Sequence, residues 1–208
     1  MTGHPISARS GQTPLHFVGA YHARASTGSR GLSPLGRSLR RFKDSGDRYS
    51  GRCLASLFAG VFASPAAGFD LVVAVPADHE RLHRRGYSPA GWLASALARA
   101  GRLHIDASTL RHVRGRPSQR GLDGETRRAN ARGAIRLGRP AVEGYAVLLV
   151  DDVCTTGATL ADATRCLFDA GAVRVECAVL ACADDDLLPA CPSTTDDAGI
   201  TDTVTRLR

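Results

Sequence analysis

Two segments of the chain begin with a continuous apolar run and continue into a segment of helical periodicity. The first run, LVVAV at 71–75, is rich in β-branched residues and predicts a strand that is covered on both faces. A polar, arginine-rich loop follows it, after which Ser88 and Pro89 match the N-cap and the first position of a helix. This helix has one apolar side and ends at Gly101.

The second run, YAVLLV at 145–150, predicts another strand, and residues 157–170 predict the helix that follows. A further strand is predicted at 173–181. Because short links join strand, helix and strand, we expect a parallel βαβ unit. Two such units predict an α/β fold: an open, doubly wound, Rossmann-like sheet of mostly parallel strands. Its ligand crevice is expected at the carboxyl ends of the strands.

The remaining segments show weaker patterns. Residues 34–63 predict two helices that are divided near Ser45, and residues 14–23 predict a short strand. Residues 103–140 predict a charged excursion with short strands near 110–113 and 134–137.

These patterns divide the chain into three parts. We expect a partly ordered N-terminal extension at 1–33, a main domain at 34–182, and an acidic, polar, poorly ordered tail at 183–208.

Composition indicates the cellular setting. Hydrophobic residues make up 43% of the chain and charged residues 23%, as in ordinary globular proteins. The first dozen residues lack the apolar core of a signal peptide. Residues 53–69 carry no charge, but Pro65 and many small residues favour an alanine-rich buried helix over a membrane span. We therefore expect a cytoplasmic protein without membrane contact.

The six cysteines do not suggest a metal site. No two of them have the C-x2-C spacing of a zinc ribbon, so we expect no zinc and assign no metal ligand. Small buried hydrophobic side chains in a reducing compartment are favoured over disulfides. Cys154 is an exception, because a position just before a helix N-terminus favours the thiolate.

The net charge of +7 is concentrated in one segment. Residues 111–139 contain nine arginines and only two acidic residues, whereas the rest of the chain is balanced. Such a segment suits an anionic ligand, either a polyphosphate or a nucleic acid. Lys43 is the only lysine, so part of this bias reflects a general preference for arginine.

Residues 147–160, VLLVDDVCTTGATL, place two aspartates where a buried strand is expected to end. The following loop enters a helix N-terminus, whose free backbone N–H groups and dipole attract anions. Asp151 and Asp152 would repel a phosphate, but they accept hydrogen bonds from hydroxyl groups. A ribose 5-phosphate satisfies both parts of the motif. The alternative is that Asp151 caps the turn, Asp152 is solvated and the threonines are helix caps.

The run D-D-V-x-T-T-G-A-T-L closely resembles the 5-phosphoribosyl 1-pyrophosphate (PRPP) binding motif of type I phosphoribosyltransferases. Within that superfamily the chain is most similar to the ComF family. The likeness lies in FKDSGDR (42–48), VPADHERLHRRGYSPAGWLASALA (75–98) and RPSQRGLDGETRRANARGAI (116–135), and covers roughly 34–182. It implies the type I phosphoribosyltransferase fold, with a small N-terminal helical hood and an arginine-rich flexible flap at about 111–139.

The resemblance also implies roles for individual residues. Asp151 and Asp152 would be the catalytic pair that holds the ribose hydroxyls. The 5-phosphate would lie on Thr155, Thr156, Gly157, Ala158 and Thr159. The pyrophosphate would face Pro76, Arg81, Arg84, Arg85 and Gly86. The flap would contribute Gln119, Arg127, Arg128 and Asn130.

The implied activity is transfer of the 5-phosphoribosyl group from PRPP to a nitrogenous acceptor, with release of pyrophosphate. Mg²⁺ would arrive with PRPP, and a homodimer is possible. Two alternatives remain open: a protein that binds PRPP or a nucleotide without catalysis, and a DNA-uptake factor whose arginine-rich segment contacts DNA or a DNA-processing partner.

The sequence departs from the family pattern in three places. The N-terminal four-cysteine zinc ribbon is missing, Ser88 and Pro89 replace the usual Asn-Gln, and the usual flap threonine is Arg116 or absent. The resemblance implies that the last two positions shape the acceptor pocket.

Overall fold

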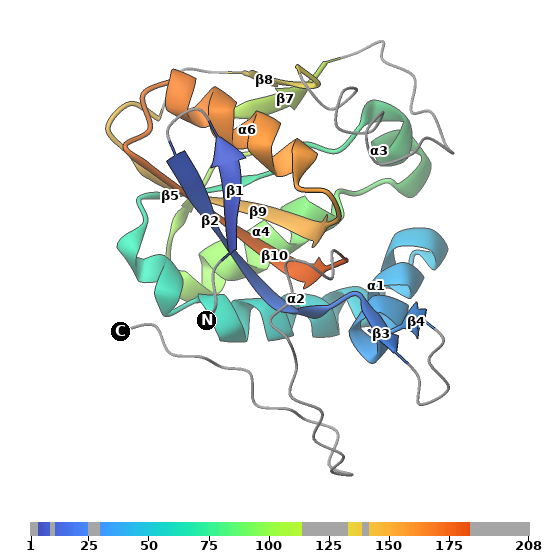
Figure 1. Ribbon diagram of the computed structural model, residues 1–208. Coiled ribbons are helices and arrows are strands. Elements are labelled where there is room, and N and C mark those ends of the chain that lie inside the picture. Colours follow the sequence, from blue (N-terminus) through green and yellow to red (C-terminus); the bar gives the residue numbers. More distant parts are fainter. Residues whose placement is uncertain (1–3, 9–10, 25–29, 114–132, 139–141, 184–208) are drawn as a thin grey trace.

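The computed structural model describes residues 4–8, 11–24, 30–113, 133–138 and 142–183 (Figure 1). The strands are β1 (His4–Ala8), β2 (Gly11–Ala20), β3 (His22–Arg24), β4 (Arg30–Leu32), β5 (Leu71–Ala74), β6 (His104–Ile105), β7 (Leu110–His112), β8 (Ile135–Leu137), β9 (Ala146–Cys154) and β10 (Arg174–Cys182). The helices are α1 (Pro34–Ser45), α2 (Arg48–Phe62), α3 (His79–Arg85), α4 (Pro89–Gly101) and α6 (Ala158–Asp169), with a 3₁₀ turn at Pro65–Gly68.

The main sheet has the strand order β1-β2-β10-β9-β5-β6. Every neighbouring pair in it is parallel except β1–β2, which is antiparallel, so the expected mostly parallel sheet is confirmed. In the sheet β9 lies between β10 and β5, and β5 lies between β9 and β6. The chain runs from β5 through α3 and α4 to β6 on one side, and from β9 through α6 to β10 on the other side. The two connections therefore leave in opposite directions from adjacent strands. This makes the junction of β5 and β9 a topological switch point.

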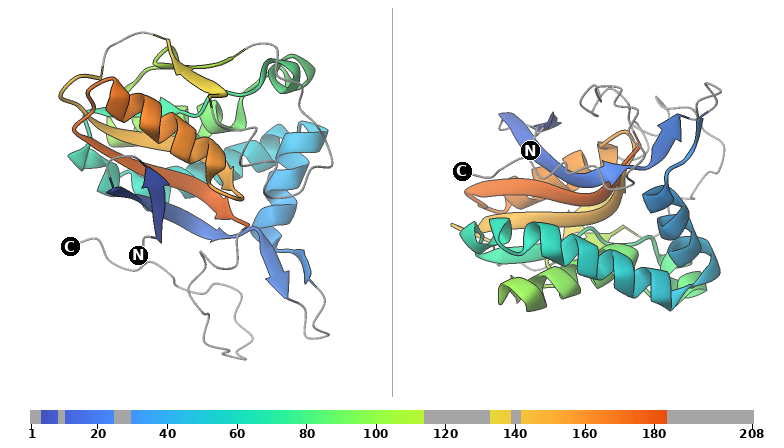
Figure 2. Two further views of the ribbon diagram at one scale, coloured as in Figure 1. Left: turned by 45° about the horizontal axis from the view of Figure 1, so that its top comes forward. Right: turned by 90° about the horizontal axis from the view of Figure 1, so that it is seen from below.

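Helices cover both faces of the sheet (Figure 2). Alternate residues of β9 explain this arrangement, because successive side chains in a strand point to opposite faces. Val147 and Leu149 belong to the same core cluster as Leu160 of α6. Leu148 and Val150 belong to a second cluster with residues of α1, α2 and α4. Both faces of β9 are thus apolar, as the unbroken apolar run predicts.

Local signals set the helix boundaries. Ser33 accepts a hydrogen bond from the Gly36 N–H and begins α1, and Ser88 does the same for α4 through the Gly91 N–H. The predicted division of 34–63 into two helices is confirmed, and Gly46 separates them with a φ of +68°. The predicted helix at 157–170 corresponds to α6.

Two local predictions need correction, and one short strand was missed. Residues 79–85 form the short helix α3 rather than a loop, because Asp78 caps its start and Gly86 adopts a left-handed conformation at its end. β9 does not end at 150: its parallel pairing with β10 continues to Cys154, so the two aspartates lie inside the strand. β6 was not predicted, and it is a two-residue edge strand whose side chains are exposed.

The N-terminal segment contributes to the main sheet. The strand predicted at 14–23 is observed as β2, which pairs in parallel with β10 and carries the buried Leu15. The short strands predicted near 110–113 and 134–137 are β7 and β8, and they pair with each other as an antiparallel ribbon. The tail lies outside the described residues, apart from Ala183. In the described part of the chain, no helix has the length and apolar character required to span a membrane.

Candidate functional site

The acidic pair lies near the carboxyl end of β9, beside the end of β5. The backbone N–H of Val75 donates to the carbonyl of Val150 at 2.8 Å, so the loop that begins at Pro76 starts next to Asp151. This is the switch point of the sheet, where the loops after the two strands diverge. The fold therefore brings the start of one predicted ligand loop to the acidic pair.

Asp152 forms an ion pair that the sequence did not suggest. Lys43 of α1 places its Nζ 3.0 Å from both Oδ1 and Oδ2 of Asp152. The Lys43 side chain is 23% exposed and that of Asp152 is 12% exposed, so the pair is largely shielded from water. Such shielding strengthens the attraction between the two charges relative to a surface pair.

Asp151 is in a different electrostatic state. Its Oδ1 accepts the backbone N–H of Asp152 at 2.7 Å. Burial by neighbouring protein, followed by repulsion from the Asp152 carboxylate, raises the pKa of Asp151 to about 8, although the Asp152 N–H and Lys43 oppose the shift. The raised pKa favours the protonated form of Asp151 at neutral pH.

The loop after β9 leaves the start of α6 open. Gly157 occupies the N-cap position with a φ of +69°, and no side chain caps the helix there. In the described part of the chain, α1, α2, α3 and α4 each have a side-chain cap at this position. Thr155 and Thr159 are exposed beside the uncapped end. The free N–H groups and the helix dipole can hold an anion such as a phosphate.

The predicted pyrophosphate residues are not equivalent in the structure. Arg81 and Arg84 are exposed on α3, and Gly86 follows them with a φ of +74°. Arg85 is mostly buried and lies 3.8 Å from Asp44 of α1. Two of the three arginines are thus accessible to an anion, and the third connects the end of α3 to α1.

The predicted flap residues Gln119, Arg127, Arg128 and Asn130 lie outside the described residues. The ribbon β7–β8 at the ends of this segment is described, and it is attached to α6. Asp162 accepts the backbone N–H groups of Gly133 and Ile135, each at 2.9 Å, and pairs with Arg165 at 2.8 Å. These bonds connect one end of the flap segment to the helix that begins at the candidate phosphate loop.

Cys154 does not have the predicted thiolate character. It is the last residue of β9, is 1% exposed, and pairs in register with Cys182 of β10. A hydrogen bond to Cys182 and burial both raise the pKa of the Cys154 thiol. The extension of β9 explains the difference, because it places the thiol in the sheet instead of at the helix N-terminus. Cys166, Cys177 and Cys182 are also buried, as expected, but Cys53 is exposed.

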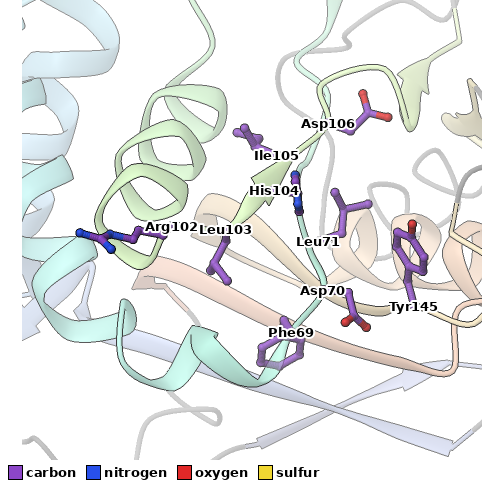
Figure 3. A pocket seen from close by; sticks show the side chains of 9 residues that line it. All are labelled: Phe69, Asp70, Leu71, Arg102, Leu103, His104, Ile105, Asp106 and Tyr145. Carbon is purple, nitrogen blue, oxygen red and sulfur yellow. The ribbon is translucent and has the colours of Figure 1, made fainter.

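A cavity lies at the opposite end of the sheet. It has a volume of about 700 Å³ and lies beside the first residues of β5, β6 and β9 (Figure 3). Its two carboxylates are already used within the protein: Asp70 accepts the Ala146 N–H, and Asp106 accepts bonds from Ser108 and Thr109. The acidic groups of this cavity therefore already accept hydrogen bonds from the protein itself.

Sequence reasoning missed Lys43 and Asp44 as members of the site. Both lie in the FKDSGDR segment, which carried family likeness without an assigned role. The available signal was that a chain with 27 basic residues uses lysine only once, at this position. The contact partner could not be inferred, because it lies more than 100 residues away in sequence.

Comparison with known proteins identifies the family. The model of the family described as "Phosphoribosyl transferase domain" matches residues 82–198, more than half of the chain. The chain thus belongs to the phosphoribosyl transferase domain family, and within the type I phosphoribosyltransferase superfamily it belongs to the ComF family.

Two curated relatives illustrate the relationship. "DNA utilization protein YhgH" of Salmonella typhi is 36% identical over 107 residues, which cover 51% of this chain and 47% of the relative. "Competence protein F" of Haemophilus influenzae is 31% identical over 152 residues, which cover 70% of this chain and 66% of the relative. The chain spans about half the length of the first of these relatives.

Among solved structures, orotate phosphoribosyltransferase from Aeropyrum pernix is 22% identical, with a TM-score of 0.42. The match covers 78% of this chain and 74% of that protein.

Proposed function

We propose that this protein binds Mg-PRPP at the carboxyl ends of β5 and β9 and transfers its 5-phosphoribosyl group to a nitrogenous acceptor. One observation carries the proposal: the acidic pair and the uncapped N-terminus of α6 follow one another at the switch point of the sheet. Ribose hydroxyls suit the carboxyl groups of Asp151 and Asp152, and the 5-phosphate suits the loop from Thr155 to Thr159.

The reaction would break the bond between the anomeric carbon and pyrophosphate while the acceptor nitrogen forms a new bond to that carbon. The sugar then develops positive charge, which a nearby carboxylate such as Asp152 stabilises. The exposed Arg81 and Arg84 would stabilise the departing pyrophosphate. Mg²⁺ would be bound mainly by ligand oxygens and water, which agrees with the engagement of both Asp152 oxygens by Lys43.

Calorimetry with Mg-PRPP tests the binding step. We expect the affinity of the double variant Asp151→Asn, Asp152→Asn for Mg-PRPP to fall by at least roughly 100-fold. The reason is that loss of a polar contact in a site shielded from water typically costs about 2 kcal/mol of binding free energy or more. Asp70→Asn is the matched control, since this carboxylate lies at the opposite end of β5 and should leave the affinity unchanged. Equal affinity in the double variant and the wild type would refute the proposed site.

A screen for pyrophosphate release tests the transfer step. Wild-type protein with Mg-PRPP is incubated with a panel of nitrogenous bases and amines, and release above the hydrolysis background identifies an acceptor. Tight binding without release across the panel would favour a protein that binds PRPP as a signal.

A second candidate function is contact with nucleic acid during DNA uptake. It is supported by the +7 segment at 111–139 and by the relatives named for competence and DNA utilization. Because phosphate contacts release counterions, binding to DNA should weaken steeply as salt rises. Arg127→Ala with Arg128→Ala should reduce the salt dependence of a gel shift. An unchanged salt dependence would argue against this role of the segment.

A further inference from the structure

Lys43 contacts the acidic pair directly, and it comes from a separate part of the fold. It lies on α1, whereas Asp152 lies on β9. Its ammonium approaches both carboxylate oxygens at 3.0 Å. Lysine carries three N–H donors on a compact charge, so two contacts to Asp152 leave one donor for another acceptor.

The contacts of its neighbours fix the position of Lys43. The ring of Phe42 stacks on Tyr87 at 4.9 Å and meets Trp92 edge-on at 5.3 Å. The Tyr87 hydroxyl donates to the Phe42 carbonyl, and Asp44 pairs with Arg85. Three consecutive residues of α1 are therefore connected to three places: the end of α3, the start of α4 and the acidic pair.

The charges around the acidic pair make this cation consequential. Two adjacent carboxyl groups repel each other when both are ionised, so the pair shares a proton unless a cation compensates. The titratable groups that act on Asp151 are Asp152 and Lys43, with the thiols of Cys154 and Cys177 from β9 and β10 also near. Among these groups Lys43 is the one cation.

We propose that Lys43 is a positioning residue of the sugar-phosphate site, which orients Asp152 and holds it as the charged member of the acidic pair. The inference rests on the proposed function and deepens it. Ribose hydroxyls would then meet one fixed carboxylate acceptor at Asp152 and one carboxyl group at Asp151 that can donate a hydrogen bond.

A purely structural role predicts different behaviour. If Lys43 only fastened α1 to the sheet, its loss would lower thermal stability and leave the titration of the acidic pair and the affinity of the folded protein unchanged. The test therefore uses readouts other than stability.

The variants are Lys43→Met, which removes the charge, and Lys43→Arg, which retains it. Arg40→Met is the matched control, because Arg40 lies one turn away on α1 and pairs with Asp44 on the exposed surface. Circular dichroism and thermal melting establish that each variant is folded. If Lys43→Met does not fold, the Lys43→Arg variant tests the inference instead. A planar guanidinium contacts a carboxylate differently from an ammonium, so this variant should shift the titration of the acidic pair if Lys43 positions Asp152.

The first measurement is a carboxyl ¹³C NMR titration of the ligand-free protein. In Lys43→Met we expect the lower apparent pKa of the acidic pair to rise by about one unit or more, as loss of a close cation requires. Arg40→Met should titrate like the wild type. An unchanged titration in folded Lys43→Met would overturn the inference, whatever the protein binds.

The second measurement is the affinity for ribose 5-phosphate, a ligand with the hydroxyls and the phosphate but no pyrophosphate. We expect Lys43→Met to bind about 10- to 100-fold more weakly, the range typical for groups that orient a ligand-binding side chain. Lys43→Arg should recover part of the loss. Unchanged affinity in folded Lys43→Met would overturn the inference. Failure of the wild type to bind either ribose 5-phosphate or Mg-PRPP would overturn the proposed function instead, and the titration distinguishes the two failures.

Discussion

The two ends of the parallel sheet differ in how their polar groups are used. At the amino end a cavity of about 700 Å³ contains Asp70 and Asp106, and each accepts hydrogen bonds from nearby groups of the protein. At the carboxyl end α6 begins without a side-chain cap, and the hydrogen-bond partners of Asp151 come from Asp152, its neighbour in the strand.

The proposed site therefore rests on the polar groups at the carboxyl end and not on cavity volume. A carboxylate whose oxygens already accept hydrogen bonds from the protein gains few new hydrogen bonds when a ligand binds. The free N–H groups of an uncapped helix end gain hydrogen bonds from an anionic ligand. At the switch point the start of α6 is the part without a side-chain partner, and the acidic pair lies just before it in the chain.

The largest expected effect on stability concerns Asp162, a carboxylate whose two oxygens both accept hydrogen bonds from the protein. Asp162→Ala should lower the free energy of unfolding by about 3 kcal/mol at pH 7, because the Gly133 and Ile135 N–H groups lose their acceptor and Arg165 loses one of its two carboxylate partners. Urea denaturation measures the change. Asp169→Ala is the control, since it removes only the exposed partner of Arg165 and should cost less than about 0.5 kcal/mol.

The effect of Asp162 should also depend on pH. Its hydrogen bonds and ion pair, which outweigh burial, hold the pKa of Asp162 below its ordinary value. The stability that it contributes is therefore fully present above the unfolded-state pKa and is lost as the pH falls through the lower folded-state pKa. The difference between wild type and Asp162→Ala should shrink near pH 3. A constant difference would contradict the assignment.

Asp151→Asn should have the next largest effect, and with the opposite sign. The folded-state pKa of Asp151 is raised to about 8, so the folded protein binds more protons than the unfolded chain and stability falls as the pH rises from about 4 to 8. Asparagine cannot ionise, so thermal unfolding should show the variant near the wild type at pH 4 and about 1–2 kcal/mol more stable at pH 9. Asp70→Asn should show no such gain. A pH-independent difference for Asp151→Asn would contradict its protonated state.

Two glycines at the two ends of α6 allow a matched comparison of about 1 kcal/mol. Gly157 has a φ of +69° and Gly171 a φ of +91°, so alanine strains the backbone at either position by at least about that amount. At Gly171 the new Cβ would also lie 3.2 Å from the Glu143 Cα, so this control variant should lose at least as much stability. Only Gly157→Ala should also weaken ribose 5-phosphate binding, by roughly 10-fold, because a new Cβ would crowd the anion at the helix N-terminus. Equal affinity losses in both variants would show that the effect comes from general destabilisation.

The smallest effect is expected at the amino-end cavity. Tyr145 lines this cavity and its side chain is exposed (Figure 3). Tyr145→Ala should change the free energy of unfolding by less than about 0.5 kcal/mol and leave Mg-PRPP affinity unchanged in calorimetry. A clear loss of affinity would move the site to the amino end and break the comparison.

Much of the fold could be predicted because its signals are local. The unbroken apolar run before Asp151 indicates a strand buried on both faces, and the caps at Ser88 and Gly46 define helix ends. The short helix at 79–85 was missed because none of its residues belongs to the apolar core, so it gives no apolar periodicity. The end of β9 was misplaced because a buried strand usually ends where charged residues begin. In the structure the pairing of β9 with β10 continues past Asp151 and Asp152 to Cys154.

The sequence by itself determined the mostly parallel α/β sheet, the family, and the residue types of the candidate site, because strand patterns, caps and the D-D-V-x-T-T-G-A-T-L run are contiguous. Only the tertiary structure decided that Lys43 meets Asp152, that Cys154 is buried, and that the pKa of Asp151 is raised. These properties depend on contacts between distant segments and on the removal of water around them, and neither leaves a periodic signal along the chain.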